Sequence, residues 1–532
     1  MSQKSKLIIS KENWKKKAMN RGDEARYLRR ENKRIKQERN RLKQQVQQAK
    51  KNKELEQMKT PAVQGKVDLV FIALQLFLGA RIGFRAVSRV LGVLQNRLGL
   101  QKAPCTQTII NWVQRLSLTR IRNADDLLGS SLLNDYIWII DASIALGSGK
   151  ILTVLALKAD RHRLNTGPPT LQDVHCIAVR VSASLTGEAI AEFLLKVIQA
   201  LGRPLALLKD GGTDLAKSLK ILDQRGYNIP SIADVSHVVA NLLKHAYADH
   251  PMFDTFLSSC GKASAKLKQT VLACLAPPKV STKARFMNLH RLVTWAENLL
   301  KHSPAGRATK DSLLAKLRES MDNLPACKLF IQRFQREASI LLECQSILKN
   351  RGLSNQTVKE CESRLEDLSP YSQIRTGFVN WMRNQLETAE KLGLSEIGLP
   401  ISSDSIESLF GIAKAHGTGE VKDANRIAGR IPAMCGQVTK EDARKVLQVN
   451  CAQQQELMGN LSSLIRQRRQ ILPNPGCLED LNKDTNHDIE LIPRSKNRSK
   501  NIENKAISDD YTKRLGPTSG QVGQLTCCTD TS

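Results

Sequence analysis

The chain of 532 residues is poor in aromatic side chains, in acidic side chains relative to basic ones, and in long apolar runs. Phe, Trp and Tyr together make up 4% of its residues. No apolar run reaches the roughly 20 residues needed to span a bilayer, and the best one, 67–80, contains Asp68 and Gln75. The first residues also lack the apolar core of a secretory signal. These absences argue against a membrane-spanning or secreted protein, and we expect a cytoplasmic one.

Cysteine is present but is not arranged as a framework. The 12 cysteines are scattered, and no two of them have the Cys-x-x-Cys spacing of a zinc ribbon. A disulfide scaffold or a structural zinc site is therefore not predicted. We expect most of the cysteines to be small buried hydrophobic residues.

Positive charge is abundant. Lys and Arg number 81 against 51 Asp and Glu, which gives a formal net charge of +30. Residues 1–60 alone hold 20 basic and 7 acidic side chains. A field of this sign and size favours a polyanionic partner, either nucleic acid or an anionic membrane surface. The scarcity of aromatic residues and the lack of an apolar face on the basic segment favour nucleic acid, with no membrane partner.

Residues 1–60 predict a basic helical arm, because 23–58 contain no Pro or Gly and are rich in helix formers. Leu28, Ile35 and Leu42 recur every seven residues, but the positions four residues after each are mostly polar. This is a weak coiled-coil signal. The alternatives are a solvated basic helix, weak dimerisation through the stripe, or contact with phosphates.

Residues 66–125 predict three short helices separated by Gly and Pro, which suits a helix-turn-helix DNA-binding domain. The alternative is a three-helix packing unit without a DNA contact. Arg85 and Arg89 lie on the second helix as candidate DNA contacts. The exposed tip of the recognition helix would comprise Thr106, Gln107, Thr108 and Asn111.

Residues 132–248 alternate strand and helix patterns in the order β-β-β-α-β-α-β-α, which indicates an α/β domain with a mixed sheet. The first strand is predicted to end at Ile140 and the fourth at Leu208. Residues 249–400 show helical periodicity and no strand signal, and predict an all-helical insertion. Residues 401–470 return to the domain core, and 475–532 read as a disordered tail.

Three carboxylates are placed as catalytic candidates. Asp141 and Asp210 follow apolar strands, and Glu407 lies on the first turn of a later helix. Functional groups gather at strand ends in open α/β sheets. Carboxylate oxygens are the ligands of Mg²⁺ and Mn²⁺, and three of them could hold two ions for phosphoryl transfer. The alternative is that each aspartate is only a turn or cap residue, as Asp210-Gly-Gly would suit.

With these residues in place, the sequence resembles a DDE transposase of a bacterial insertion sequence. The matching strings are Trp138-Ile-Ile-Asp141, Leu207-Leu-Lys-Asp210 and Ser405-Ile-Glu407. In that family the first aspartate ends the first strand, the second follows the fourth, and the glutamate lies on a later helix. The resemblance implies a ribonuclease-H-like catalytic domain with a helical insertion, preceded by a basic helix and a helix-turn-helix unit.

The resemblance assigns further residues. Lys414, seven residues after Glu407, would contact transposon-end DNA. Asp234 and His237 resemble the Cys/Asp-x-x-His element of transposases with a helical insertion; the alternative for them is a helix cap and a core histidine. Some insertion-sequence families carry Arg four residues before the glutamate, and this chain has Ser403 there. Other available carboxylates are Asp214 in place of Asp210, Asp404 in place of Glu407, and the weaker Asp160 and Asp173.

The implied function is binding of terminal inverted repeats, metal-dependent strand cleavage and joining to target DNA. Mg²⁺ or Mn²⁺, in two ions, would be the cofactor, with Asp141, Asp210 and Glu407 as ligands. The protein would act on double-stranded DNA as a homo-oligomer, associated with the bacterial nucleoid. Two alternatives remain: a nuclease of the same fold that cuts without joining, and a catalytically inactive, transposon-derived DNA-binding protein.

Overall fold

The computed structural model describes most of the chain between residues 65 and 458, a short segment near the C-terminus, and parts of the N-terminal arm. The described ranges are 65–124, 135–145, 149–164, 167–182, 184–280, 285–415, 424–458 and 489–493, with parts of 11–44. Residues divide into two compact units, one formed by 1–70 with 89–104 and the other by 71–88 with 105–532. The arm residues that are described within 11–44 are helical, as predicted, and Leu28, Ile35 and Leu42 are each more than half exposed. The rest of the predicted arm, 45–60, lies outside the described residues.

The described strands form an open, mixed, six-stranded sheet in the order β5-β4-β1-β2-β3-β6. β1 is parallel to β4, and β4 is parallel to β5, whereas the β1–β2, β2–β3 and β3–β6 pairs are antiparallel. The predicted α/β class and mixed sheet are confirmed. The strands are β1 (Tyr136–Ala145), β2 (Gly149–Lys158), β3 (Val174–Ser182), β4 (Ala206–Lys209), β5 (Ser231–Ala233) and β6 (Ile489–Leu491).

One strand lies where we predicted disorder. β6 falls within the predicted tail 475–532, yet it pairs with β3 along the sheet edge. Glu490 in the middle of β6 forms ion pairs with Arg180 at 3.2 Å and with Lys196 at 2.6 Å. A strand of three residues is too short to show a periodic pattern in a polar segment. Its pairing partner, β3, lies about three hundred residues earlier in the sequence. The prediction of disorder was therefore wrong for 489–491.

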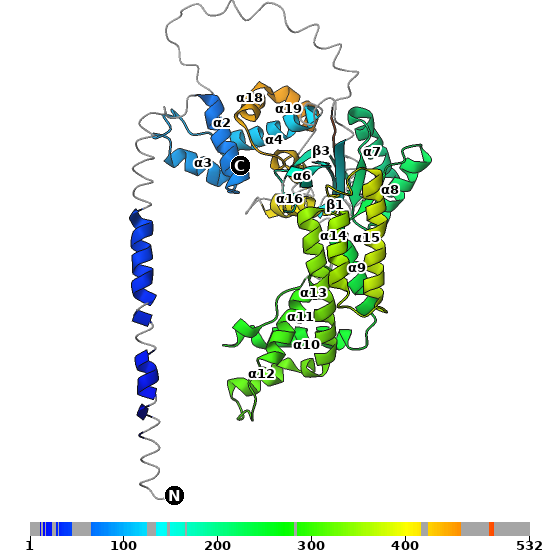
Figure 1. Cartoon of the computed structure of the whole chain (residues 1–532). Helices are drawn as coiled ribbons and strands as arrows, with labels where there is room; N and C mark the ends of the chain where they lie inside the picture. Colours follow the sequence, from blue (N-terminus) through cyan, green and yellow to red (C-terminus); the bar gives the residue numbers. More distant parts are fainter. Residues whose placement is uncertain are drawn as a thin grey trace, which may run out of the picture. The chain divides into compact units, whose positions relative to one another are not determined.

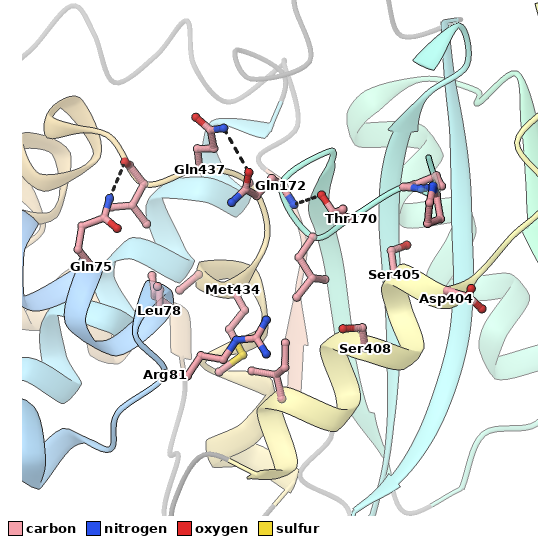
Figure 2. Close-up of a pocket in the computed structure, with 18 residues that line it drawn as sticks. Gln75, Leu78, Arg81, Thr170, Gln172, Asp404, Ser405, Ser408, Met434 and Gln437 are labelled. Atoms are coloured by element: carbon pink, nitrogen blue, oxygen red, sulfur yellow. Dashed lines mark hydrogen bonds between the residues drawn. The ribbon is translucent and has the colours of Figure 1, made fainter. Parts of the chain in front are cut away.

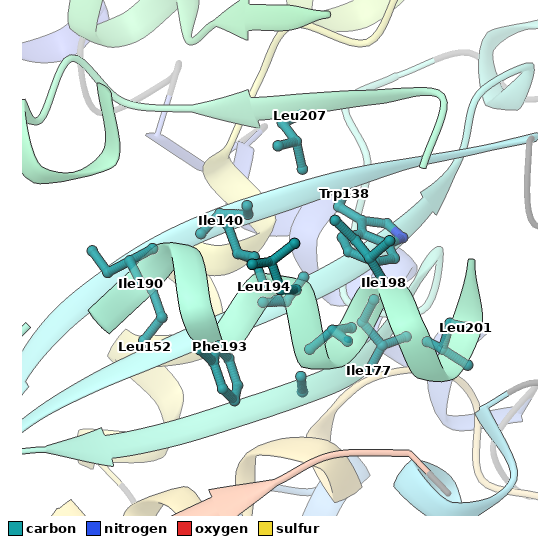
Figure 3. Packing of buried hydrophobic residues seen from close by; sticks show 14 of the residues in the cluster. Trp138, Ile140, Leu152, Ile177, Ile190, Phe193, Leu194, Ile198, Leu201 and Leu207 are labelled. Carbon is teal, nitrogen blue, oxygen red and sulfur yellow. The ribbon is translucent and has the colours of Figure 1, made fainter. Parts of the chain in front are cut away.

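The core on one face of the sheet is built by the crossover helices. The predicted helices correspond to α7 (Gly187–Leu201), α8 (Thr213–Gln224) and α9 (Val235–Tyr247). Figure 3 shows α7 lying across the strands, with Leu194 and Ile198 beside Ile140 and Trp138, and Phe193 belongs to the same buried cluster. Alternate residues of a strand point to opposite faces, so Asp141 points to the face opposite the one that α7 covers.

The second face of the sheet is covered by helices from both ends of the domain. α16 (Asp404–Ala415) contacts β1, α17 (Ala424–Ala428) contacts β2 and β3, and α4 (Thr106–Arg122) contacts β3. Arg120 of α4 is buried and donates hydrogen bonds to the carbonyl oxygens of Ala433 and Gln437 at 3.1 and 2.8 Å. The carboxyl-terminal part of the core is thereby tied to α4, and α16 is held over the face to which Asp141 points.

Helices make up the described part of 249–400, apart from an isolated bridge between Leu353 and Leu399. α9, α13, α14 and α15 pack against one another along this region (Figure 1). Tyr247, Phe330 and Phe334 form an aromatic cluster at its centre, with ring centroids 4.8–6.2 Å apart. The helices are α10 (Phe253–Leu267), α11 (Arg285–Lys301), α12 (Leu313–Met321), α13 (Lys328–Arg351), α14 (Asn355–Leu365) and α15 (Gln373–Lys391).

The remaining helices described between residues 66 and 458 have ten residues or fewer. α2 (Lys66–Leu74) runs into a π-helical turn, Gln75–Gly79, and α3 follows at Phe84–Val93. Within the described ranges, none of the helices combines the length and the apolar character that crossing a membrane requires. The others are α6 (Arg161–Leu164), α18 (Lys440–Gln448) and α19 (Cys451–Met458), with 3-10 turns at Ala273–Leu275, Leu324–Cys327 and Ile431–Met434.

Candidate active site

Asp141 and Asp210 lie at the same level on neighbouring parallel strands. In the β1–β4 ladder, Ile140 is the partner of Lys209, and each aspartate is the next residue along its chain. Adjacent strands are about 4.8 Å apart, so the register alone places the two residues side by side. Asp210 Oδ1 accepts a hydrogen bond from the Gly212 amide at 2.9 Å, which makes the turn that follows β4.

The predicted end of the first strand at Ile140 was wrong. β1 continues to Ala145, and Asp141 lies inside it, opposite Thr153 of β2. The strand extends because β2 goes on pairing with it after β4 has ended. Asp141 thus comes directly after the residues of β1 that pair with β4, but it lies within the part of β1 that pairs with β2. Whether it ends a strand therefore depends on which of the two neighbouring strands is considered.

Glu407 reaches the same region from α16. It lies on the first turn of that helix and is exposed. Although much of the residue is exposed, the surrounding protein desolvates its carboxyl group, and this desolvation together with the negative charges of Asp234 and Asp404 raises its pKa, while the positive charge of His237 opposes that shift. The structure therefore brings Glu407 into electrostatic interaction with Asp141 on β1 and with Asp234 and His237 after β5, although it is distant from all of them in the sequence.

The electrostatics of Asp141 reflect this convergence. Burial, followed by the charges of Asp210 and Glu407, raises its pKa to about 7. Its Oδ1 accepts a hydrogen bond from the Ala142 amide at 2.6 Å, which partly offsets the shift. A carboxyl group with such a pKa is a mark of sites that bind cations or transfer protons, although structural charge clusters also show it.

Asp234 links two helices that meet at this site. It is 1% exposed and caps α9, with Oδ1 accepting from the backbone amide of His237 at 2.9 Å and from its Nδ1 at 3.0 Å. Its Oδ2 accepts from the amide and the hydroxyl of Ser403, at 2.7 and 2.9 Å, just before α16. The helix-cap alternative for Asp234 is thus realised, whereas His237 is 30% exposed and is not a core histidine. The same carboxylate also fixes the start of the Glu407 helix.

The charge of His237 is set by its neighbours. The hydrogen bond that the His237 ring donates to Asp234, together with the charges of Asp234, Asp210 and Glu407, raises the pKa of His237 to about 9 against the opposing effect of burial. Although burial alone would raise the pKa of Asp234, its hydrogen bonds to His237 and Ser403 lower it. At neutral pH the pair is an imidazolium beside a carboxylate, and the positive ring interacts through its charge with Asp210 and Glu407.

Lys414 holds α16 against the sheet. Its Nζ donates a hydrogen bond to the hydroxyl of Ser143, which is on the same face of β1 as Asp141. The same ammonium lies 5.9 Å from the Phe410 ring centroid, within cation–π range. The residue predicted to contact DNA is therefore used here to position the helix that carries Glu407.

The alternative carboxylates lie outside this cluster. Asp214 is exposed on the first turn of α8. Asp160 and Asp173 make ion pairs with Lys158 and Arg161, at 3.7 and 3.4 Å. Asp404 is paired with Lys349, whose Nζ lies 2.6 Å from Oδ2. Of these four residues, Asp404 is the one whose negative charge raises the pKa of Glu407, and that charge is paired with Lys349.

The chemistry of the carboxylates fits Mg²⁺ or Mn²⁺. Both cations prefer oxygen ligands, and a cation would offset the repulsion that raises the pKa of Asp141. Asp141, Asp210 and Glu407 are the residues that would hold it. Within the described ranges, no three His, Cys, Asp or Glu side chains already stand close enough together to form a metal site. The three carboxylates interact through their charges without converging on one point in this structure.

Replacing Asp141 by Asn is expected to stabilise the fold at pH 8. Folding raises the pKa of Asp141 from 3.8 to about 7. The ionisation of Asp141 therefore lowers the free energy of unfolding as pH rises from about 4 to 7, and the loss remains at higher pH. A neutral amide avoids that loss, by about 2–4 kcal/mol at pH 8 and less at pH 5. Urea unfolding at both values measures the effect, with the exposed Asp214→Asn as control; an Asp141→Asn protein no more stable than wild type at pH 8 contradicts it.

The candidate DNA-binding residues lie at the start of α4 and on α3. The Gln107 side chain donates to Asn111 at 2.9 Å, and the Thr108 hydroxyl lies 3.2 Å from the Cys105 sulfur. Thr106 is partly buried, and Arg85 and Arg89 are exposed on α3. The later part of α4 is core, because Trp112, Val113 and Leu116 are buried. The three predicted helices are present, and the candidate contact residues of the third, which are exposed or partly exposed, lie in its first two turns.

Two residues that position the site were not found from the sequence. Ser403 was noted only as a departure from a family pattern, yet its amide and hydroxyl both hold Asp234. Lys349, from the middle of the helical insertion, neutralises Asp404 beside Glu407. A pair of serines before a helix is a capping signal that could have pointed to Ser403. Lys349 had no such signal, since it joins the site only through folding of the insertion.

No family model and no curated protein matches this sequence. An open mixed sheet flanked by helices serves many unrelated functions. Any function proposed for this chain must therefore rest on the placement of the carboxylates, on His237 and on the charge of the protein.

Proposed function

We propose that the protein is a DDE-type DNA transposase with a ribonuclease-H-like catalytic domain. The observation that carries the proposal is the shared field of three carboxylates from three distant segments. Asp141 and Asp210 are side by side after the paired parts of β1 and β4, and Glu407 lies on a helix that packs on β1. This is the arrangement of first strand, fourth strand and later helix that the sequence resemblance implies.

The side chains would divide the work as follows. Asp141, Asp210 and Glu407 would hold two Mg²⁺ or Mn²⁺ ions, which when bound supply a stronger nucleophile and stabilise the leaving oxygen in phosphoryl transfer. The imidazolium of His237, whose charge interacts with Asp210 and Glu407, would attract a phosphodiester toward them. Asp234, through Ser403, holds the glutamate helix in place. Lys414, released from Ser143, would contact the DNA backbone.

DNA binding would combine two contributions. The basic arm, with 20 Lys and Arg in residues 1–60, would add affinity that falls with salt and does not depend on sequence. Arg85, Arg89 and the first turn of α4 would read the transposon ends in the major groove. The protein would act as a homo-oligomer on paired ends, as the resemblance implies.

An in vitro cleavage and joining assay tests the proposal. Labelled DNA from the flanks of the gene is incubated with the full chain and Mg²⁺ or Mn²⁺, and products are resolved on denaturing gels. We expect nicking at the element ends and joined products, both abolished by EDTA. Cleavage without joining would favour a nuclease, whereas end binding with no cleavage in either metal would favour an inactive DNA-binding protein.

A further inference from the structure

A cavity lies along α16, and Glu407 does not line it. Its volume is about 700 Å³, and it is lined by the first half of α16, the loop 168–172, the segment 433–438 and the turn 75–81. Glu407 is not among its lining residues, although Ser405 and Ser408 on the same helix are. The cavity is thus distinct from the candidate active site but shares a helix with it.

Hydrogen bonds between side chains and backbone join the elements around the cavity (Figure 2). Gln75 donates to the carbonyl of Val438 at 3.4 Å, and Gln437 donates to the side chain of Gln172 at 3.3 Å. The Gln172 amide in turn donates to the hydroxyl of Thr170. Three chain segments far apart in the sequence are therefore linked around one hollow.

The hydroxyl of Ser405 is buried in this wall with no partner. The residue is 2% exposed, and its Oγ makes no hydrogen bond to any described residue. Three other buried helical serines, Ser117, Ser218 and Ser320, donate their hydroxyl to a helix carbonyl at 2.6–3.2 Å. Ser259 of α10 has a buried hydroxyl without a partner too, but unlike Ser405 it does not line this cavity. Since a buried polar group without a partner costs free energy, the exception at the cavity points to a ligand that completes it.

Arg81 supplies a positive charge to the same cavity. Its φ is +55°, a left-handed conformation that residues other than glycine adopt at a cost and that clusters at functional sites. The turn that carries it is braced by the stacked rings of Phe77 and Phe84, whose centroids are 4.1 Å apart, and by Arg430 over Phe84 at 4.7 Å. Figure 2 shows the Arg81 guanidinium beside Met434, facing Ser408.

The charge balance of the lining favours an anion. Its carboxylate, Asp404, is neutralised by Lys349 at 2.6 and 2.9 Å. Among the described residues, no carboxylate forms an ion pair with Arg81. The start of α16 adds the positive end of a helix dipole, which favours phosphate groups. Leu78, Ile412 and Met434 give the rest of the cavity an apolar wall.

We propose that this cavity binds one nucleotide. Arg81 and the hydroxyls of Ser405 and Ser408 would bind its phosphate, and Leu78 and Met434 would contact the face of its base. The volume is several times that of a phosphate ion and leaves room for the sugar and base. The nucleotide would come from an unpaired DNA strand, a source that rests on the proposed function, or from a free mononucleotide in solution.

Binding of dAMP, dTMP and inorganic phosphate to the full chain, measured by titration calorimetry, tests the site. We expect both nucleotides to bind at least about 10-fold tighter than phosphate, because the base adds contacts. Arg81→Gln and Ser405→Ala are each expected to weaken nucleotide binding about 10-fold, the effect of losing a hydrogen bond to a charged group. The Ser405→Ala protein should be at least as stable as wild type, because it loses an unpaired buried hydroxyl.

The control variants change the same residue types at positions that do not line the cavity. Ser259 of α10 is also buried with an unpartnered hydroxyl, and Arg203 is an exposed arginine between α7 and β4. Ser259→Ala and Arg203→Gln should bind nucleotides within about twofold of wild type. Absence of nucleotide binding, or wild-type binding by Arg81→Gln and Ser405→Ala, would overturn the proposal.

Binding of duplex DNA with and without an overhang distinguishes the two sources of the nucleotide. A duplex with a three-nucleotide overhang should bind tighter than a blunt duplex only when Arg81 and Ser405 are intact, if the nucleotide belongs to a strand. If dAMP binds and the overhang gives no advantage, the ligand is a free nucleotide. Nucleotide binding without DNA cleavage would overturn the proposed function alone, and cleavage without nucleotide binding would overturn this site alone.

Discussion

Asp141→Asn and Asp210→Asn are each expected to lower metal-dependent DNA cleavage by about 10³-fold or more while end binding persists. Both side chains lie at one level of the β1–β4 ladder, where they would hold the cations that polarise the scissile phosphate. An amide keeps the size of the side chain but removes the charge that binds a divalent cation, and losses of such residues are typically this large. Single-turnover cleavage of labelled end DNA, with gel-shift binding of the same DNA, measures both quantities.

Two controls separate catalysis from stability. Asp214→Asn removes an exposed carboxylate close in the sequence to Asp210 and should cleave at the wild-type rate. Asp141→Asn should unfold at a higher urea concentration than wild type at pH 8, so an inactive variant cannot be explained by unfolding. Full cleavage by Asp141→Asn, or equal loss in Asp214→Asn, would remove the carboxylate assignment.

Asp234→Ala is expected to lower the unfolding free energy by about 3–5 kcal/mol, the cost of breaking a buried charged pair. The carboxylate is 1% exposed and accepts four hydrogen bonds, two from His237 and two from Ser403. Its loss leaves the His237 ring without its partner and frees the start of α16. Urea unfolding at pH 7 measures the stability, and cleavage by the folded variant should fall because Glu407 is no longer fixed.

The pH dependence of this loss follows from two opposite shifts. The pKa of His237 is raised to about 9, so its contribution to stability is full below its unfolded value and is lost as pH rises through 9. The pKa of Asp234 is lowered, so its contribution is full above its unfolded value and is lost as pH falls below it. The difference between wild type and Asp234→Ala should therefore be greatest between about pH 5 and 6.5 and shrink as pH rises from there through 9.

The matched control is a residue that caps one helix and, unlike Asp234, does not also bind the start of another. Ser312 caps α12 by accepting from the Ala315 amide at 3.1 Å and contacts no distant segment by hydrogen bond in the described chain. Ser312→Ala should cost about 1 kcal/mol with no such pH dependence. If Asp234→Ala cost no more than Ser312→Ala, Asp234 would be only a cap, and its role in holding α16 would be rejected.

The alternation of strand and helix between 136 and 247 could be predicted from local patterns. Strands β1 to β5 and helices α7 to α9 each carry their own apolar period and their own start and stop residues, such as the Thr186 cap of α7. Because Asp141 and Asp210 come directly after apolar runs in this series, their candidacy could be predicted too. The excess of basic residues, which indicates an anionic partner, likewise needs no structure.

The sequence by itself determined the class of fold, the order of its main elements, the positive charge and the identity of the candidate carboxylates. Tertiary structure alone decided that β1 passes Asp141, that β6 joins the sheet, that Ser403 and Lys349 support the glutamate helix, and that Ser405 faces a cavity with Arg81. The physical reason is the range of the interactions. Propensity and periodicity act within a few residues, whereas strand partners, ion pairs across an insertion and unpartnered buried hydroxyls depend on segments that meet only after the chain has folded.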